Sequence, residues 1–446
     1  MAPGTAAAGG GAPMDHEPDL RLSLELLTPA FAGGAEPSVC DSTWPLRPSA
    51  VRGALRAWLR FLAAPWPDRD WAREVQGLEE RLFGHTGQAS LVVIEPPEVK
   101  EKGQPLDPRA LIRPDRRGAG DRGYRYLGYG KFENPARPAE ALFMQPGQRI
   151  ELAFRLKYRR GDPASDEQRA AEREVLRAAI WSWAHLGGLG SRSRRGFGSL
   201  FAAHLGDHWP AWVVRRPPQS GASAREEVET QTKKAAEIVK GYLSEHRKVA
   251  VSPAPTARRE VRTFAGMQID VLPMEFDSGE EALTQVGELF LRFRSSIERP
   301  KMGMVKLPDY QEVKEFIRLG TAPQRLDRAE LGLPLNFYYR SLAGGPQKAS
   351  FLPDGGERIP SPLHFRVQRL ANGRVVVLLL DLRGPDALLG RGLVGKVPGS
   401  GKRELGPGAK LVPNRPSLIR LFIAWATAQL GGGRSGAGRA GGGGGR

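Results

Sequence analysis

The chain has very few of the features that mark secreted or membrane proteins. It contains one cysteine, Cys40, among 446 residues, so it cannot form an internal disulfide or a cysteine-rich metal site. The longest clean apolar run, residues 375–380, is far shorter than the roughly 20 residues needed to cross a bilayer. The opening residues have no cationic segment before an apolar one and predict no secretory signal. We therefore expect a soluble, cytoplasmic protein that has no membrane partner.

Acidic side chains are also scarce relative to basic ones. The chain has 66 Lys and Arg against 49 Asp and Glu, which gives a formal net charge of +17 at pH 7. Such a balance indicates a nucleic-acid partner or, less often, an anionic membrane surface. The length predicts about two to three domains.

Motifs for catalysis or cofactor binding are weak. Residues 118–123 spell G-x-G-x-x-G, but they are expected to form a loop without the flanking strand and helix that a dinucleotide site requires. Residues 390–396 approach a P-loop, yet Val397 occupies the position that needs Ser or Thr. His204 and His208 are four residues apart across the end of an expected strand, not on one helix face. We expect no cofactor, no metal and no catalytic residues.

The apolar periodicity of the first half switches between strand and helix spacing. Strands are expected at 20–26, 90–95, 149–157 and 198–205, and helices at 47–64 and 165–186. The second helix begins with a Ser-x-x-Gln capping box at Ser165 and ends at Gly187. The order strand–helix–strand–strand–helix–strand matches the split βαβ arrangement of a ferredoxin-like domain.

The second half has a similar but less regular pattern. Expected elements are helices at 225–247, 280–295, 309–319 and 416–430, strands at 267–273 and 333–340, and a hairpin at 362–382. The dipeptide Asn372-Gly373 predicts a type I′ turn for that hairpin. The predicted fold class is α+β, with two ferredoxin-like (split βαβ, RRM-like) domains in tandem, the second diverged. Their expected limits are residues 19–206 and 225–430, separated by a linker at 207–224, with a basic loop at 383–415 and disordered tails at 1–18 and 431–446.

A loop rich in glycine and arginine follows the helix at 165–186. Its candidate RNA-binding residues are Gly187, Gly188, Gly190, Arg192, Arg194, Arg195, Gly196 and Gly198. Glycine lets backbone approach a ligand closely, and arginine offers a fork of donors that suits phosphate. A helix C-terminus repels anions, so the arginines themselves must attract the phosphate. The alternative is that they only offset the helix dipole; three of them around a buried-looking Phe197 favour a binding loop.

A second basic row lies on the helix at 47–64. Arg52, Arg56 and Arg60 recur every four residues on the flank opposite an apolar stripe, and Arg47 precedes them. In a ferredoxin-like domain both helices cover the same face of the sheet. We therefore expect Arg47, Arg52 and Arg56 to line one RNA-binding groove with the loop, although such a row is commonly a solvated face. Trp58 is expected to be buried in the stripe.

The helix followed by GGLGSRSRRGFGS resembles the glycine-rich loop of the RAMP superfamily of CRISPR systems. The segments LELLTPAFAGGAE, LRPSAVRGALRAWLR, LEERLFGHTG, YRYLGYG and SPLHFRVQRLANGRVVV resemble, in order, the first RAMP subunits of type III-B (Cmr) effector complexes. The resemblance covers most of residues 20–382 but leaves the 383–415 loop and the glycine-rich tail without a family counterpart.

The resemblance implies a non-catalytic subunit of a CRISPR ribonucleoprotein. Its implied partners are the guide CRISPR RNA near the 3′ end, the target RNA and other RAMP subunits, with antiviral defence as the role. The rival hypothesis is a metal-independent endoribonuclease that processes precursor CRISPR RNA, with His85 or His364 assisting attack by a ribose 2′-hydroxyl. Neither histidine has a partner nearby in the sequence.

Overall fold

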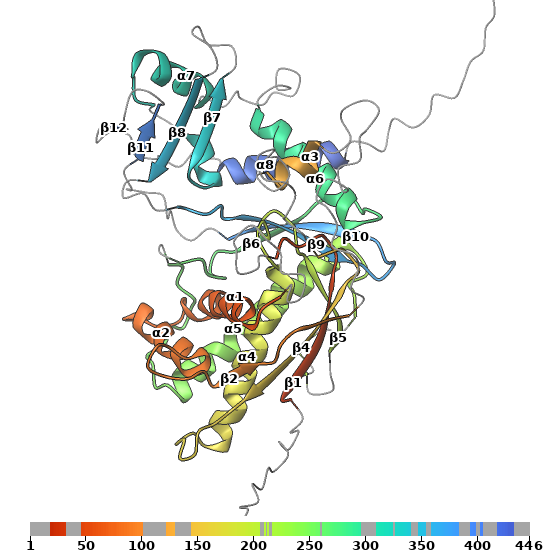
Figure 1. The fold of residues 1–446 in the computed structure, drawn as a ribbon, viewed down its shortest axis with the longest axis vertical. Helices are drawn as coiled ribbons and strands as arrows, with labels where there is room; N and C mark the ends of the chain where they lie inside the picture. Colours follow the sequence, from red (N-terminus) through yellow and green to blue (C-terminus); the bar gives the residue numbers. More distant parts are fainter. Residues whose placement is uncertain are drawn as a thin grey trace, which may run out of the picture.

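The structure is a computed structural model of the chain (Figure 1). It describes residues 18–32, 46–100, 122–129, 144–205, 209–210, 212–213, 216–258, 261–295, 309–323, 326–339, 347–353, 358–382, 393–397, 402–404 and 417–431. The tails predicted to be disordered lie almost wholly outside these residues. Of the basic loop predicted at 383–415, residues 393–397 and 402–404 are described, and 393–396 and 402–404 form strands rather than loop.

The first sheet is antiparallel and is built from the strands that alternation predicts. Its strands are β1 (Leu20–Leu26), β2 (Val92–Ile94), β3 (Glu98–Lys100), β4 (Arg149–Leu156) and β5 (Leu200–Leu205). They pair in the order β2-β4-β1-β5, and β3 also pairs with β4. Leucines at every second position of β1 are buried, whereas Arg21 between them is exposed, as expected for a strand with one face on a core.

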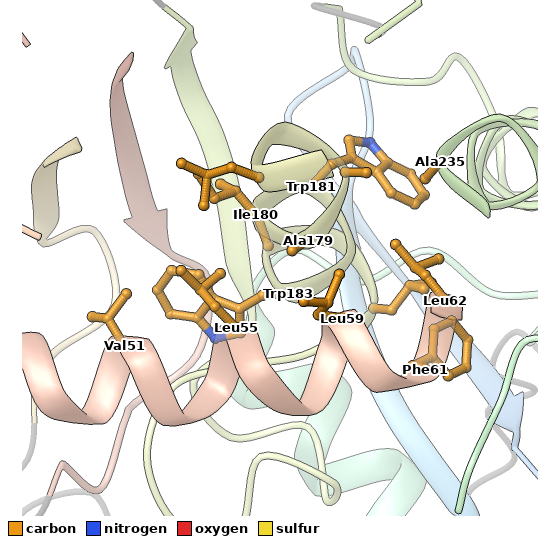
Figure 2. Close-up of a cluster of buried hydrophobic side chains, with 14 of the residues drawn as sticks. Val51, Leu55, Leu59, Phe61, Leu62, Ala179, Ile180, Trp181, Trp183 and Ala235 are labelled. Atoms are coloured by element: carbon orange, nitrogen blue, oxygen red, sulfur yellow. The ribbon is translucent and has the colours of Figure 1, made fainter. Parts of the chain in front are cut away.

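Two helices build the core of this unit. In α1 (Pro48–Ala63) the buried stripe includes Val51, Leu55 and Leu59. This stripe packs against α4 (Asp166–Leu186), and Figure 2 shows it facing Ala179 and Trp183. Half of the predicted capping box is confirmed, because the Ser165 side chain accepts a hydrogen bond from the Gln168 amide; the Gln168 side chain instead donates to Glu172. Trp58 is only half-buried, so its predicted full burial is wrong.

A helix that sequence analysis missed lies beside α1. In α2 (Trp71–Phe83) the buried residues Val75, Leu78 and Leu82 recur at helical spacing, so the apolar pattern was present in the sequence. A shorter helix, α3 (Arg122–Leu127), begins within the last two residues of the G-x-G-x-x-G stretch and continues past it. The expectation that no helix comes after that stretch is therefore wrong.

The charged helix predicted at 225–247 is α5 (Gly221–Glu245), which opens with a reciprocal Ser220–Ser223 capping box. It packs mainly on α4, and its apolar residues join the core of the first sheet. A second sheet follows from β6 (Gln268–Val271), β9 (Leu363–Arg369) and β10 (Val375–Asp381), in the antiparallel order β6-β10-β9.

The β9–β10 hairpin is buried on both faces. Val377 and Leu379 contact α6 (Gly279–Ser295) and α8 (Leu418–Gly431) in one core, whereas Leu378 and Leu380 belong to the core of the first sheet. This double burial explains the continuous apolar run of β10. The hairpin is confirmed, but its turn is not type I′: Gly373 has φ +83°, and Asn372 is not in the left-handed region.

A third sheet stands at one end of the molecule (Figure 1). It consists of β7 (Leu335–Tyr339), β8 (Gln347–Pro353), β11 (Leu393–Lys396) and β12 (Lys402–Glu404), in the order β12-β11-β8-β7. Together with α7 (Asp309–Leu319) it has its own apolar core, and a 3-10 helix, η2 (Asp327–Leu331), packs on α8. Of this sheet unit, only β7 and α7 were predicted. The segment at 390–396 that approaches a P-loop ends in strand β11.

Candidate nucleic-acid interface

A cleft of about 1830 Å³ lies between the glycine–arginine loop and the β7–β8 sheet. One wall comes from α1 and residues 187–195, and the other from β7, β8 and residues 358–361. Residues of α3 and α6 complete the lining. The cleft therefore brings together parts of all three units.

The cleft is strongly basic. Its cationic lining residues are Arg60, Arg192, Arg194, Arg195, Arg262, Arg294, Lys348 and Arg358. No Asp or Glu is found among the lining residues that the structure describes. Sites that bind single-stranded nucleic acid combine positive charges for the phosphates with aromatic rings for the bases. The lining of this cleft has both.

The loop is anchored in the protein at its C-terminal end. Phe197 is fully buried, with its ring centroid 4.9 Å from that of Phe31 and 5.1 Å from that of Tyr124. The Thr28 hydroxyl donates to the Gly196 carbonyl at 2.7 Å and accepts from the Ser199 amide at 2.9 Å. The predicted burial of Phe197 is confirmed, and it holds the preceding arginines in one place.

The loop also pairs with the second sheet. The Phe365 amide on β9 donates to the Arg194 carbonyl at 3.1 Å, and Arg195 forms an isolated parallel bridge with Phe365. The Ser199 hydroxyl accepts from the Val367 amide at 3.1 Å. The arginine backbone is therefore fixed to rigid elements on both sides.

Arg195 lies over two aromatic rings. Its guanidinium carbon is 4.9 Å from the Phe290 centroid and 5.7 Å from the Phe365 centroid. Its Nη1 atom is buried and has no hydrogen-bond partner among the described residues. Burial, and then repulsion from Arg294, lower the pKa of Arg195 to about 9. An anion at this site would supply the missing partner.

Arg192 and Arg194 are half-buried and repel a further cation. Burial, followed by the charge of Arg358, lowers the pKa of both arginines. Arg192 has φ +65° and donates to the Tyr129 carbonyl. The Arg194 guanidinium makes no hydrogen bond to the residues that the structure describes. These unpaired like charges favour a bound polyanion over the empty cleft.

Arg262 and His364 meet at the base of the cleft. Arg262 Nη1 is 3.1 Å from His364 Nε2, and its Nη2 donates to the Pro360 and Ser361 carbonyls at 2.8 Å. Burial lowers the pKa of Arg262 to about 9. Burial, and then Arg262, hold the pKa of His364 well below 6.5, so the imidazole is neutral at pH 7.

A different arginine caps the C-terminal end of α4. Arg366, buried on β9, donates through Nη1 to the Gly187 carbonyl at 3.1 Å. Its Nη2 donates to the carbonyls of Ala184 and Leu200. This cation satisfies the orphan carbonyls and opposes the helix dipole. The loop arginines are therefore not needed for that role, which argues against their interpretation as a dipole-offsetting cap.

The loop glycines fall into two groups. Gly187, Gly188 and Gly190 line the cleft. Gly196 and Gly198 are buried and have φ values of +85° and +64°. A Cβ on Gly196 would lie 2.5 Å from Leu283 Cδ2. At these two positions glycine lets the loop pack on its own protein, and their predicted role in RNA binding stays a prediction.

The structure does not bring Arg47, Arg52 and Arg56 to the cleft. The Arg56 guanidinium donates to the Phe83 carbonyl at 2.9 Å and to the Gly84 carbonyl, at the end of α2. Helix α1 meets the cleft through Ala50, Ala54, Ala57, Trp58, Arg60 and Phe61. Of the predicted arginine row only Arg60 therefore lines this cleft, and RNA binding by Arg47, Arg52 and Arg56 stays a prediction.

Several lining residues were missed by sequence reasoning. Four of the cations, Arg262, Arg294, Lys348 and Arg358, and three tyrosines, Tyr126, Tyr129 and Tyr338, all lie in the cleft. They are distant in sequence from the loop, and only the tertiary fold brings them together. The segment YRYLGYG quoted for the family resemblance was an available signal, since it contains Tyr126 and Tyr129.

The described residues contain no group of three His, Cys, Asp or Glu side chains that could hold a metal ion. None of the helices in the described ranges is both long and apolar enough to cross a membrane. His204 lies near the end of β5, and the neighbouring His208 lies outside the described residues.

A family comparison identifies the first half of the chain. Residues 23–201 match the model of the RAMP superfamily. Residues 23–201 therefore belong to the RAMP superfamily. The resemblance carried by the glycine-rich loop is thereby confirmed. Among curated protein sequences, none matches this RAMP protein.

Solved structures with the same fold cover nearly the whole chain. The apo crystal structure of Cmr1 from Pyrococcus furiosus matches with a TM-score of 0.53 and 16% identity, over 91% of this chain and 96% of that chain. A chain of Type III-B Cmr-beta bound to cognate target RNA and AMPPnP in the presence of ssDNA (state 2) matches with a TM-score of 0.51 and 14% identity, over 93% and 100%. A chain of Cmr-beta bound to cognate target RNA matches with a TM-score of 0.50 and 12% identity, over 92% and 99%. The α+β fold of this RAMP protein is therefore similar to that of Cmr1.

Proposed function

We propose that this RAMP protein is a non-catalytic RNA-binding subunit of a type III-B CRISPR effector ribonucleoprotein. In this proposal it contacts the guide CRISPR RNA near its 3′ end and the target RNA, assembles with other RAMP subunits, and acts in the cytoplasm in antiviral defence. The observation that carries it is the cleft, which is lined by eight cations, of which Arg60 pairs with Glu79, and by no carboxylate among the described residues. Two of the structures similar to this chain are Cmr complexes bound to target RNA.

The strand orders support two ferredoxin-like units in tandem. The first order, β2-β4-β1-β5, is the one that a split βαβ repeat produces when each crossover skips one strand. The second order, β6-β10-β9, is the same arrangement without its last strand, with α6 and α8 as the crossover helices. In this view the third sheet is an insertion that supplies the opposite wall of the cleft.

The test of RNA binding is the salt dependence of affinity for a single-stranded RNA. Each neutralised phosphate contributes a slope of about −0.7 in log K against log salt, so Arg192→Ala/Arg194→Ala should flatten the slope by about 1.4. The matched control is Lys233→Ala/Lys234→Ala, which removes two exposed charges from α5 outside the cleft. Equal slopes for the wild type and the arginine variant would refute phosphate binding by this loop.

The rival endoribonuclease hypothesis has one observation in its favour, since His364 lines the cleft. Its Nε2 faces the Arg262 guanidinium, however, and the ring is buried. His85 is exposed in a turn after α2 and does not line the cleft. The two hypotheses can be separated by incubating the purified protein with repeat RNA in EDTA. Discrete cuts by the wild type that are absent with His364→Gln would favour the nuclease.

Assembly is tested separately by co-purification. A tagged copy expressed with its neighbouring genes should copurify with other RAMP subunits and short guide RNAs. Purification with ribosomes and no guide RNA would instead indicate a general basic RNA-binding protein.

A further inference from the structure

In the part of the chain that the structure describes, the strongly exposed aromatic rings lie in the cleft. Large apolar side chains that are strongly exposed in the described residues include two aromatic ones, Tyr129 at 63% and Tyr338 at 51%. Both of them line the cleft. An exposed ring inside a basic cleft offers an unused flat apolar face, which is what a nucleobase needs for stacking.

Tyr338 stands on an open sheet face. Alternate residues of β7, including Phe337 and Tyr339, point into the core of the third sheet unit. Tyr338 points to the opposite face, where Lys348 is its register partner on β8 and places its ammonium 5.7 Å from the ring centroid. The register fixes the ring beside a cation, so one residue pair presents a stacking surface next to a phosphate-binding group.

A polar pair adjoins this ring. Asn336 and Ser350 are register partners one step along the same face, and the Ser350 hydroxyl donates to Asn336 Oδ1 at 2.8 Å. Both residues line the cleft. The Asn336 amide group keeps two donors for the edge of a base that stacks on Tyr338.

Tyr129 occupies the other side, next to the arginines. Its backbone carbonyl accepts from the Arg192 guanidinium, and the ring remains exposed. The cleft therefore has an exposed tyrosine beside a cation on each wall.

We propose that the β7–β8 face and Tyr129 form base-stacking platforms for an unpaired RNA strand. This inference rests on the proposed function and deepens it. One base stacks on Tyr338 and another on Tyr129, while the phosphates lie against Arg192, Arg194, Arg358 and Lys348. Stacking tolerates any base, because every base has a π-face. Bases in a duplex are stacked on one another, so the cleft should prefer a single strand over a duplex.

The test compares a labelled oligouridine with an abasic oligonucleotide of the same length. Tyr338→Ala should weaken oligouridine binding by about 5- to 150-fold and leave abasic binding and the salt slope unchanged. Tyr338→Phe should retain the wild-type affinity, because it keeps the ring. Leu319→Ala is the control: it removes a side chain that is 75% exposed on α7, outside the cleft. Tyr129→Ala should behave like Tyr338→Ala.

Three outcomes would overturn the inference. An equal loss for both probes in Tyr338→Ala would show that the residue supports the backbone or the fold, and no loss for either would show that the face does not stack bases. A loss in Tyr338→Phe as large as in Tyr338→Ala would assign the effect to the hydroxyl. The proposed function fails on a different result, namely wild-type binding without a salt slope. A steep wild-type slope with unaffected tyrosine variants would refute stacking only.

Discussion

Removal of the Arg194 charge should weaken RNA binding without destabilising the protein. In the free protein this guanidinium has its pKa lowered by burial and by the charges of Arg358 and Arg192. The charged form is therefore less favourable in the folded state than in the unfolded chain at neutral pH. Arg194→Met keeps the aliphatic stem and removes the charge, so the melting temperature should stay the same or rise.

The effect on binding follows from one lost phosphate contact. The slope of log K against log salt should become shallower by about 0.7. Over a fourfold increase in salt, the affinity of the variant should therefore fall about 2.6-fold less than that of the wild type. Fluorescence anisotropy with a labelled single-stranded RNA at several salt concentrations measures this difference, and a thermal melt of the same samples measures stability.

Arg366→Met is the contrasting variant, because it removes a fully buried guanidinium with a structural role. It leaves the carbonyls of Gly187, Ala184 and Leu200 without their donor, and each unsatisfied buried carbonyl costs about 1–3 kcal/mol. Its melting temperature should fall clearly. If Arg194→Met lowered the melting temperature as much as Arg366→Met, or bound RNA with the wild-type slope, the reasoning would be refuted.

Three further results are expected. Arg56→Ala should lower the free energy of unfolding by about 1 kcal/mol, because it removes a cap from α2, and should leave the salt slope unchanged; a flatter slope would return this residue to the interface. Arg81→Met should cost about 3–5 kcal/mol in urea unfolding, since it strips the cation from Glu172 and Asp162. The Arg81 hydrogen bond holds the pKa of Asp162 below 3.8, so the contribution of Asp162 is complete at neutral pH and is lost as the pH falls below 3.8, a loss that Arg81→Met should diminish. Wild type and His364→Gln should show the same pH dependence of RNA affinity between about pH 6 and pH 8, because the pKa of His364 lies well below 6.5.

Local pattern was sufficient for the elements that bury one continuous face. The alternation at 20–26 and 149–157 and the helical stripe at 47–64 reappear as β1, β4 and α1. Two strands of the third sheet, β11 and β12, escaped prediction for a physical reason. β11 and β12 have four and three residues, which is too few for a period of two to stand out from a basic segment rich in glycine and proline.

The arginine row on α1 shows what spacing leaves open. A repeat of four residues places Arg52, Arg56 and Arg60 on one helix face but does not reveal which element covers that face. Here α2 covers part of it: Arg60 pairs with Glu79, and Arg56 reaches the last carbonyls of that helix. The apolar stripe of α2 is visible in the sequence. A prediction of this helix would have indicated that the arginines of α1 could have partners within the protein.

The glycine–arginine loop differs from that row, because residues other than its arginines cap the preceding helix and anchor the loop. Arg366 caps α4 from β9, and Phe197 anchors the loop in the core beneath α6. A cation in the centre of the buried run LHFRVQR was a visible signal that some backbone carbonyls needed it. With the helix end satisfied by Arg366, the charges of Arg192, Arg194 and Arg195 are not needed to cap α4. In the free protein these arginines repel the cations on the opposite wall of the cleft. A bound phosphate backbone would replace that repulsion with attraction.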